Sequence, residues 1–187
     1  LSHSSAASDV YKRQVLGKEV VFARDTPNFI ANRLGIFAIL SMLHIAEREG
    51  LSVPLVDALS GPLMGRPKSA TLRLCDIIGL DTLARVSQTA YDGLFDDPWR
   101  AVFALPRCIE RMLDAGLLGE KNGGGFYKKT DKGILTLNMS TLDYEEGKRP
   151  RLGGLAEQKG DSRDQVRALW EEEGKWAEIG RAHLREV

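Results

Sequence analysis

The stretch "DTPNFIANRLGIFAIL" (residues 25–40) decides the fold of this chain, because it begins like a helix and continues as an almost wholly apolar one. Thr26 is a residue type that caps helices, and Pro27 is favoured at the first helical position, where its missing N–H costs nothing. The pattern predicts a helix from Pro27 to about Glu49. Since nearly every side of residues 34–46 is apolar, we expect this helix at the centre of a bundle or under a second subunit.

Asn32 stands out in this helix, because it and Arg33 occupy a turn where apolar residues are expected. We expect it in the second turn, near the positive end of the helix dipole, where its N–H could polarise a carbonyl or hold a hydroxyl. The alternative is a core asparagine that is hydrogen-bonded to neighbouring backbone, and the residues alone favour that alternative. Arg33 most simply pairs with a carboxylate at the bundle surface.

Helical spacing recurs along the chain, with short loops between the apolar segments. We expect further helices over residues 53–59, 69–78, 81–94, 106–115 and 166–173, with Asp81 as the cap of the third. We expect short strands over residues 18–23, 134–137 and 142–144. The predicted fold class is therefore mainly α, a helical bundle followed by a short irregular and β extension.

The ends of the chain differ in character from its middle. The segment SDVYKRQ (residues 8–14) and the segment EIGRAH (residues 178–183) resemble translated adapter sequence at the edges of metagenome-derived reading frames. We therefore expect residues 1–14 and 178–187 to be non-native tails. The predicted domains between them are a helical domain over residues 15–129 and an extension over residues 130–177.

Composition and charge exclude several classes of function. The chain has 187 residues, of which 43% are apolar, and its 26 Lys and Arg residues balance 26 Asp and Glu residues. A net charge of zero gives no electrostatic reason to expect nucleic acid or an anionic membrane as a partner, and no apolar stretch is long enough to span a membrane. Cys75 and Cys108 lie among apolar neighbours, which predicts buried, reduced thiols in a cytoplasmic protein.

The glycine clusters and the histidines do not form a recognisable site. GPLMGRPKS (residues 61–69) lacks the contiguous GK[ST] of a phosphate-binding loop. NGGGF (residues 122–126) opens no helix, so we expect a tight turn that lets Phe126 and Tyr127 pack onto the bundle. His44 is more simply a packed residue than a base, and no Cys/His cluster has metal-ligand spacing. No metal site or dinucleotide site is predicted in these residues.

Four short segments carry the most specific signal. They are TPNFIANR (residues 26–33), GPLMGRP (61–67), LCDIIGLD (74–81) and GEKNGGGFY (119–127). In this order they resemble the motifs PGF-x-x-NR, G-x-P-M-G-P, L-x-D-x-x-GLD and GEK-x-G-x-GFY of the C-terminal domain of 3-hydroxyacyl-CoA dehydrogenases. Asn28 stands where many members have Gly. GRPKSAT and DYEEGKRPR also resemble the long bacterial members that are fused to an enoyl-CoA hydratase module.

The resemblance covers about residues 17–175. It implies the NAD-dependent oxidation of an L-3-hydroxyacyl-CoA to a 3-ketoacyl-CoA in fatty acid β-oxidation, with an acyl-CoA substrate and a homodimer formed through the helical domain. It also implies that NAD is bound by a Rossmann domain before Val15, where a His–Glu pair takes the hydroxyl proton, and that further sequence follows. We expect the chain alone to be inactive.

Asn32 maps to the asparagine of the NR motif, which in this family holds the reacting oxygen together with a serine of the Rossmann domain. A neutral amide suits this role because it can bond the hydroxyl and the developing carbonyl without competing for the proton. The alternatives are a relative that acts on 3-hydroxybutyryl-CoA in butyrate metabolism and a helical dimerisation module without a site. In the enzyme Asn32 should line a cleft with a free amide, whereas in the module it should be buried and hydrogen-bonded.

Overall fold

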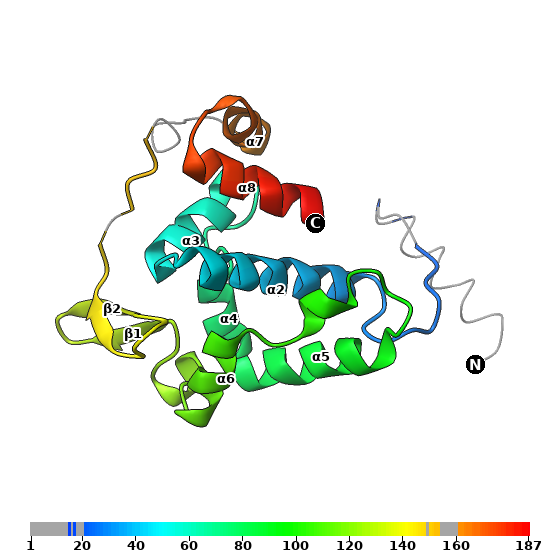
Figure 1. The fold of residues 1–187 in the computed structure, drawn as a ribbon, viewed down its shortest axis with the longest axis horizontal. Coiled ribbons are helices and arrows are strands. Elements are labelled where there is room, and N and C mark those ends of the chain that lie inside the picture. The colour runs from blue at the N-terminus through cyan, green and yellow to red at the C-terminus, as the bar shows by residue number, and fades with distance from the viewer. Residues whose placement is uncertain (1–14, 16, 18–20, 149, 154–160) are drawn as a thin grey trace.

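Helices form most of the structure, and one short antiparallel sheet follows the main bundle along the chain (Figure 1). The computed structural model describes residues 15, 17, 21–148, 150–153 and 161–187. Its helices are α2 (Ala31–Glu49), α3 (Val53–Ser60), α4 (Leu72–Ile78), α5 (Leu80–Gly93), α6 (Arg107–Asp114), α7 (Ser162–Glu171) and α8 (Lys175–Glu186). Three short 3₁₀ segments are η1 (Pro62–Met64), η2 (Arg100–Phe103) and η3 (Glu120–Asn122). The strands β1 (Tyr127–Thr130), β2 (Gly133–Leu137) and β3 (Tyr144–Glu146) pair in that order. The prediction of a mainly α fold with a short β extension is confirmed.

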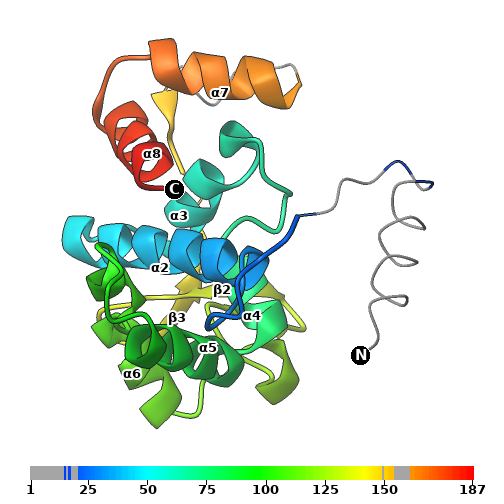
Figure 2. The same cartoon turned by 90° about the vertical axis from the view of Figure 1, so that its right-hand side faces the viewer.

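Helix α2 crosses the middle of the molecule and is covered on two opposite sides (Figures 1 and 2). Helices α3 and α8 lie on one side of it, and α5 and η2 lie on the other. Leu40, Met42 and Leu43 of α2 have no exposed surface, as expected for a helix that is apolar all round. The prediction of a central helix is therefore confirmed.

The start of α2 differs from the sequence prediction. The helix begins at Ala31, and Thr26 does not cap it. Asn28 and Phe29 have φ angles of +64° and +45°, which a right-handed helix cannot include. Asparagine tolerates this left-handed conformation better than most residues, which explains why Gly or Asn suits this position of the motif. Asn32 consequently lies in the first turn of α2 and not in the second.

The turn before α2 is fixed against α5. The Nδ2 atom of Asn28 donates a hydrogen bond to the carbonyl oxygen of Val86 at 3.0 Å. Pro27 lies against Gly93, where an added Cβ atom would come within 2.5 Å of the proline ring. Any side chain at position 93 would therefore displace this turn. The two contacts determine where the first residues of α2, including Asn32, lie relative to α5.

Left-handed residues also shift two other expected boundaries. Helix α4 begins at Leu72 because Ala70 has a φ of +50°, and β3 begins at Tyr144 because Leu142 has a φ of +65°. Asp81 does not cap α5 as predicted. Its carboxylate instead accepts a hydrogen bond from Lys121 Nζ at 2.5 Å.

The prediction of a strand over residues 18–23 is wrong for residues 21–23, which are the part of it that the structure describes. Residues 21–23 form no strand, and Val21 and Phe22 are 72% and 85% exposed. A single apolar run without a neighbouring strand cannot pair its backbone groups, so its β-type composition does not produce a sheet here. Residues 18–20 and the expected tail over residues 1–14 lie outside the described residues.

The glycine-rich segment after α6 binds the carboxylate of Asp76 in α4. The backbone N–H groups of Phe126 and Tyr127 donate to its two oxygens, each at 2.8 Å. Gly125 passes so close that an added Cβ atom would lie 2.0 Å from Asp76 Oδ1. Phe126 is fully buried, so the predicted tight turn that packs onto the bundle is confirmed. The motifs LCDIIGLD and GEKNGGGFY thus form one structural unit.

Asp76 should make the stability of the fold depend on pH. Burial raises the pKa of its carboxyl from 3.8 to about 6, although the two N–H donors oppose this shift. The folded state therefore holds the proton more tightly than the unfolded chain, so the stabilising contribution is fully present below about pH 4 and is lost as the pH rises through about 6. We expect the free energy of unfolding to fall by about 1–3 kcal/mol over this range.

Denaturant titrations at several pH values check this, with Asp76→Asn as the comparison. The variant cannot titrate at this position, so its free energy of unfolding should depend less on pH than that of the parent chain between about pH 4 and 7. Burial also raises the pKa of Asp57, so Asp57 lowers the free energy of unfolding with rising pH in the parent and in the variant alike. Equal pH slopes in the parent and the variant would contradict the assignment to Asp76.

Residues 178–186 form most of α8, which packs against α2. The Ser41 hydroxyl lies 3.2 Å from His183 Nδ1 and donates to Glu186 at 2.6 Å. Burial lowers the pKa of His183 to about 4, so this fully buried histidine is neutral at physiological pH. That residues 178–187 are not native to the protein stays a prediction.

Candidate functional site

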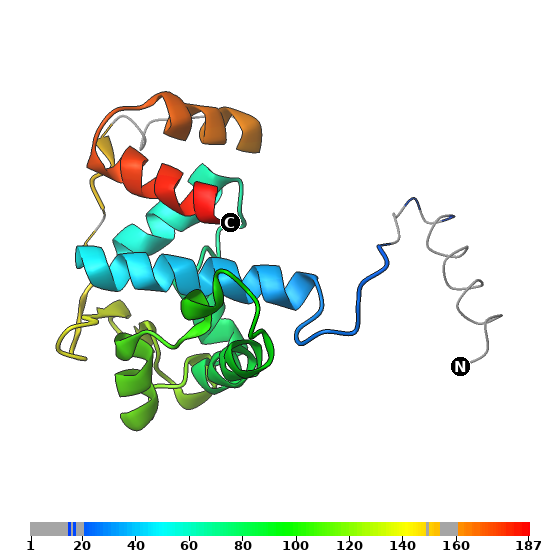
Figure 3. The same ribbon diagram turned by 45° about the vertical axis from the view of Figure 1, so that its right-hand side comes forward.

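A pocket of about 570 Å³ lies beside the N-terminal half of α2. Helices α4 and α5 and the loop that follows η1 supply its other walls, and Figures 1 and 3 show α5 running beside this half of α2. The walls are mainly apolar and include Ile36, Ile39, Leu74 and Val86. Few polar side chains reach this pocket, and Asn32 is one of them. A mainly apolar hollow with a few polar groups is the usual form of a small-molecule site.

Asn32 is an exposed residue at this pocket. Within the described part of the chain its side-chain amide makes no hydrogen bond. Its position in the first turn of α2 places the amide near the positive end of the helix dipole, which strengthens an N–H donor. Asn32 is therefore not the buried, hydrogen-bonded asparagine that a purely structural role requires.

Arg33, the neighbour of Asn32, has a structural partner. Its guanidinium pairs with the carboxylate of Asp97, which also accepts a hydrogen bond from the backbone N–H of Trp99 at 2.8 Å. The Asp97 side chain is only 7% exposed, so the pair is partly shielded from water. The prediction that Arg33 pairs with a carboxylate is confirmed, and the pair ties α2 to the segment before η2.

His44 and the two cysteines have structural roles. His44 Nε2 lies 3.2 Å and 3.0 Å from the carbonyl oxygens of Val102 and Ala104, so it is a packed residue as predicted. Cys75 and Cys108 are free and buried, and burial raises the pKa of both thiols, which keeps them protonated and poorly nucleophilic. Among the described residues no group of three or more His, Cys, Asp or Glu side chains could hold a metal ion.

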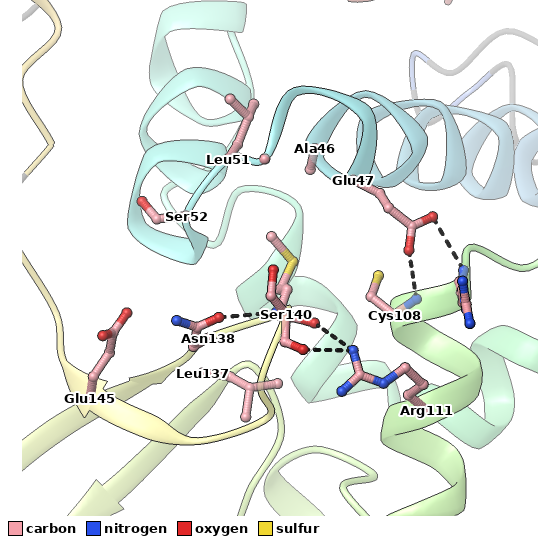
Figure 4. Close-up of a pocket in the computed structure, with 13 residues that line it drawn as sticks. Ala46, Glu47, Leu51, Ser52, Cys108, Arg111, Leu137, Asn138, Ser140 and Glu145 are labelled. Carbon is pink, nitrogen blue, oxygen red and sulfur yellow. Dashed lines mark hydrogen bonds between the residues drawn. The ribbon is translucent and has the colours of Figure 1, made fainter.

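A second pocket, of about 520 Å³, lies at the C-terminal end of α2 (Figure 4). Two of its charged side chains, Glu47 and Arg111, join neighbouring elements. The Glu47 carboxylate accepts hydrogen bonds from the backbone N–H groups of Arg107 and Cys108 at 3.3 Å and 2.9 Å, which caps the start of α6. Arg111 donates to the carbonyl oxygen of Ser140 at 2.8 Å. We therefore assign Glu47 and Arg111 a structural role.

Sequence reasoning missed Asp57, whose carboxylate joins three segments. It accepts hydrogen bonds from the backbone N–H groups of Thr71, Leu72 and Arg73 at 3.2, 2.6 and 3.0 Å, and from the Tyr127 hydroxyl at 2.8 Å. It thus satisfies the free N–H groups at the start of α4 from another helix. No local pattern could reveal a cap supplied from outside the helix. Arg66, at the pocket of Asn32, was likewise not recognised as a site residue.

No helix in the described residues is both long and apolar enough to cross a lipid bilayer.

The profile of the 3-hydroxyacyl-CoA dehydrogenase C-terminal domain matches residues 29–129, which include Asn32 and the pocket around it. This match spans the segment from the turn before α2 to β1. Three of the four motifs lie wholly within this match, and the match includes residues 29–33 of the first.

Similar proteins agree with this match. A probable 3-hydroxyacyl-CoA dehydrogenase of Bacillus subtilis is 45% identical over 153 residues, which are 80% of this chain and 19% of that protein. A putative fatty acid oxidation complex trifunctional enzyme of Rickettsia prowazekii is 30% identical over 140 residues, which are 72% of this chain and 19% of that protein. The crystal structure of FadB2 of M. tuberculosis matches with a TM-score of 0.52 and 32% identity, over 69% of this chain and 44% of that one.

The chain therefore spans less than half the length of each of these relatives. The profile match lies in the helical domain that carries the pocket. Fold, motif order and similarity all lead to one assignment. This chain belongs to the 3-hydroxyacyl-CoA dehydrogenase family and contains the C-terminal domain of that family.

Proposed function

We propose that this chain supplies the helical substrate domain of an NAD-dependent L-3-hydroxyacyl-CoA dehydrogenase of fatty acid β-oxidation. The observation that carries the proposal is the free amide of Asn32 at a mainly apolar pocket. An acyl thioester has the matching chemistry, because an apolar chain leads to a polar oxygen at C3. The names of the relatives, which include fatty acid oxidation, support the same reaction.

In this proposal Asn32 binds the oxygen that reacts. Oxidation converts the C3 hydroxyl into a carbonyl, so the oxygen loses its proton and becomes a better hydrogen-bond acceptor. The Asn32 amide donates an N–H to this oxygen in both states, and its position at the start of α2 strengthens that donor. Since the amide is neutral, it does not take the proton itself. The apolar walls receive the acyl chain and exclude water from it.

In this proposal the described residues do not bind NAD. Their sheet has three antiparallel strands, and no glycine-rich turn leads from a strand into a helix. The turn at residues 123–125 instead lies against Asp76 and Tyr144. We therefore assign cofactor binding, proton removal and hydride transfer to a separate NAD-binding domain of the enzyme. The chain alone should be inactive and should bind NAD poorly.

The proposal extends to assembly and location. Three exposed apolar side chains lie in the turn before α2 and in its first turn: Phe29, Ile30 and Leu34, which are 58%, 42% and 55% exposed. Such a group of side chains suits a contact with another domain or subunit. We propose a homodimer through the helical domain and a cytoplasmic enzyme.

The test is to join this chain to an NAD-binding domain and to measure turnover. This chain would replace the corresponding domain of the Bacillus subtilis relative, which gives a joined protein with an NAD-binding domain. The joined protein should form NADH from L-3-hydroxyacyl-CoA, whereas this chain alone should not. The unchanged relative is the control for the assay.

Two results would contradict the proposal. A folded joined protein without turnover would favour the dimerisation module, and NAD-dependent turnover by this chain alone would overturn the division of roles. The same assay with acyl chains of different length separates the β-oxidation enzyme from a 3-hydroxybutyryl-CoA dehydrogenase.

A further inference from the structure

Arg66 lies at the same pocket as Asn32, and no Asp or Glu side chain lines this pocket. Arg66 is partly buried, and within the described residues its guanidinium makes no hydrogen bond or ion pair. Arg33 and Arg73, by contrast, pair with Asp97 and Glu120. A partly buried cation without an anion is unfavourable, and the burial lowers the pKa of Arg66 for the same reason.

The backbone around Arg66 holds it in place at the pocket. Gly65 ends η1 in the left-handed conformation, with a φ of +68°, and its N–H donates to the carbonyl oxygen of Pro62 at 2.8 Å. The N–H of Arg66 donates to the carbonyl oxygen of Gly61 at 3.2 Å, and Pro67 follows directly. A tight turn with two hydrogen bonds and a proline loses little freedom when a ligand binds. The motif G-x-P-M-G-P has proline where this chain has Arg66, so the cation is not part of the general motif.

We propose that Arg66 binds an anionic oxygen group of the substrate while the acyl chain lies on the apolar walls of the pocket. This inference rests on the proposed function, because it takes the ligand to be an acyl-CoA. An acyl-CoA can offer two such groups: the phosphates of CoA and, in a dicarboxylic acyl chain, the carboxylate remote from the thioester. A guanidinium binds either group through two parallel N–H donors, and no acidic side chain at the pocket competes for it.

The test measures ligand binding to the 187-residue chain by NMR titration, which detects millimolar dissociation constants. The three probes are hexanoyl-CoA, adipyl-CoA and the N-acetylcysteamine thioester of hexanoate, which carries no phosphate. The variants are Arg66→Met, which removes the charge, and Arg66→Lys, which keeps it without the two parallel donors. Arg85→Met is the matched control, because Arg85 is exposed on α5 and does not line the pocket.

Arg66→Met should weaken binding of at least one CoA thioester by about tenfold or more, and Arg66→Lys should weaken it less. Arg85→Met should stay within about twofold of the parent chain. The same spectra show whether each variant is folded. If the phosphates are the partner, Arg66→Met weakens both CoA thioesters equally and leaves the phosphate-free thioester unchanged. If the remote carboxylate is the partner, the loss is confined to adipyl-CoA.

The inference is overturned if Arg66→Met binds all three probes within about twofold of the parent chain, or if the parent chain binds neither CoA thioester at millimolar concentration. The proposed function fails separately, in the turnover assay. If the joined protein shows no turnover while Arg66→Met still weakens binding to the 187-residue chain, the proposed function is contradicted and the anion site at Arg66 is supported.

Discussion

Asn32→Ala should lower kcat/KM of the joined protein by about 100- to 1000-fold, because it removes a donor to the oxygen on which charge develops. The amide is free in the structure and lies at the pocket, so no other contact is lost with it. Asn32→Asp should lose at least as much activity, since a carboxylate of nearly the same shape replaces the N–H donor by an acceptor. Steady-state oxidation of an L-3-hydroxyacyl-CoA measures both variants.

Asn122→Ala is the matched control for this experiment. Asn122 is exposed, lies outside the pocket, and has no side-chain hydrogen bond within the described residues. Its loss should leave kcat/KM within about twofold of the parent value, as expected for a surface change. If Asn32→Ala behaves like this control, Asn32 does not bind the reacting oxygen.

Asp76→Ala should have the largest effect on stability, with a loss of about 3–5 kcal/mol at neutral pH. The substitution leaves the N–H groups of Phe126 and Tyr127 without their acceptor, in a place where Asp76 is only 1% exposed. It also opens a void beside Gly125, whose backbone lies directly against the carboxylate. Urea titration of the 187-residue chain measures the loss.

Asp131→Ala provides the comparison. Asp131 is exposed in the turn between β1 and β2, and its side chain makes no hydrogen bond or ion pair within the described residues. Its removal should change the free energy of unfolding by less than about 0.5 kcal/mol. A loss below about 1 kcal/mol for Asp76→Ala would show that Asp76 does not join the two motifs in the way we describe.

The fold follows from sequence where burial alone decides it. Residues 34–46 are apolar on nearly all sides, and α2 is the central helix for that reason. The shifted starts of α2 and α4 occur where residues other than glycine take left-handed conformations. Asn28 and Ala70 do so before these helices, and neither residue predicts a left-handed turn as strongly as glycine would.

The site was only partly visible in the sequence. Asn32 was predicted as a site residue from its motif, while composition and spacing alone favoured a packing role for it. Arg66 and Asp57 were missed because their roles depend on their tertiary surroundings. Arg66 lies at a pocket without an anionic partner within the described residues, and Asp57 caps α4 from another helix. Local patterns report which residues are near in sequence, and neither of these relations is local.

The most direct test of the central claim observes the Asn32 amide itself. In ¹⁵N-labelled chain, the side-chain amide signals of Asn32 should shift on titration with acetoacetyl-CoA, whose C3 carbonyl is the oxygen we assign to this donor. The amide signals of Asn122, outside the pocket, should stay in place. Saturation of the chain with acetoacetyl-CoA while the Asn32 amide signals remain unshifted would contradict the account.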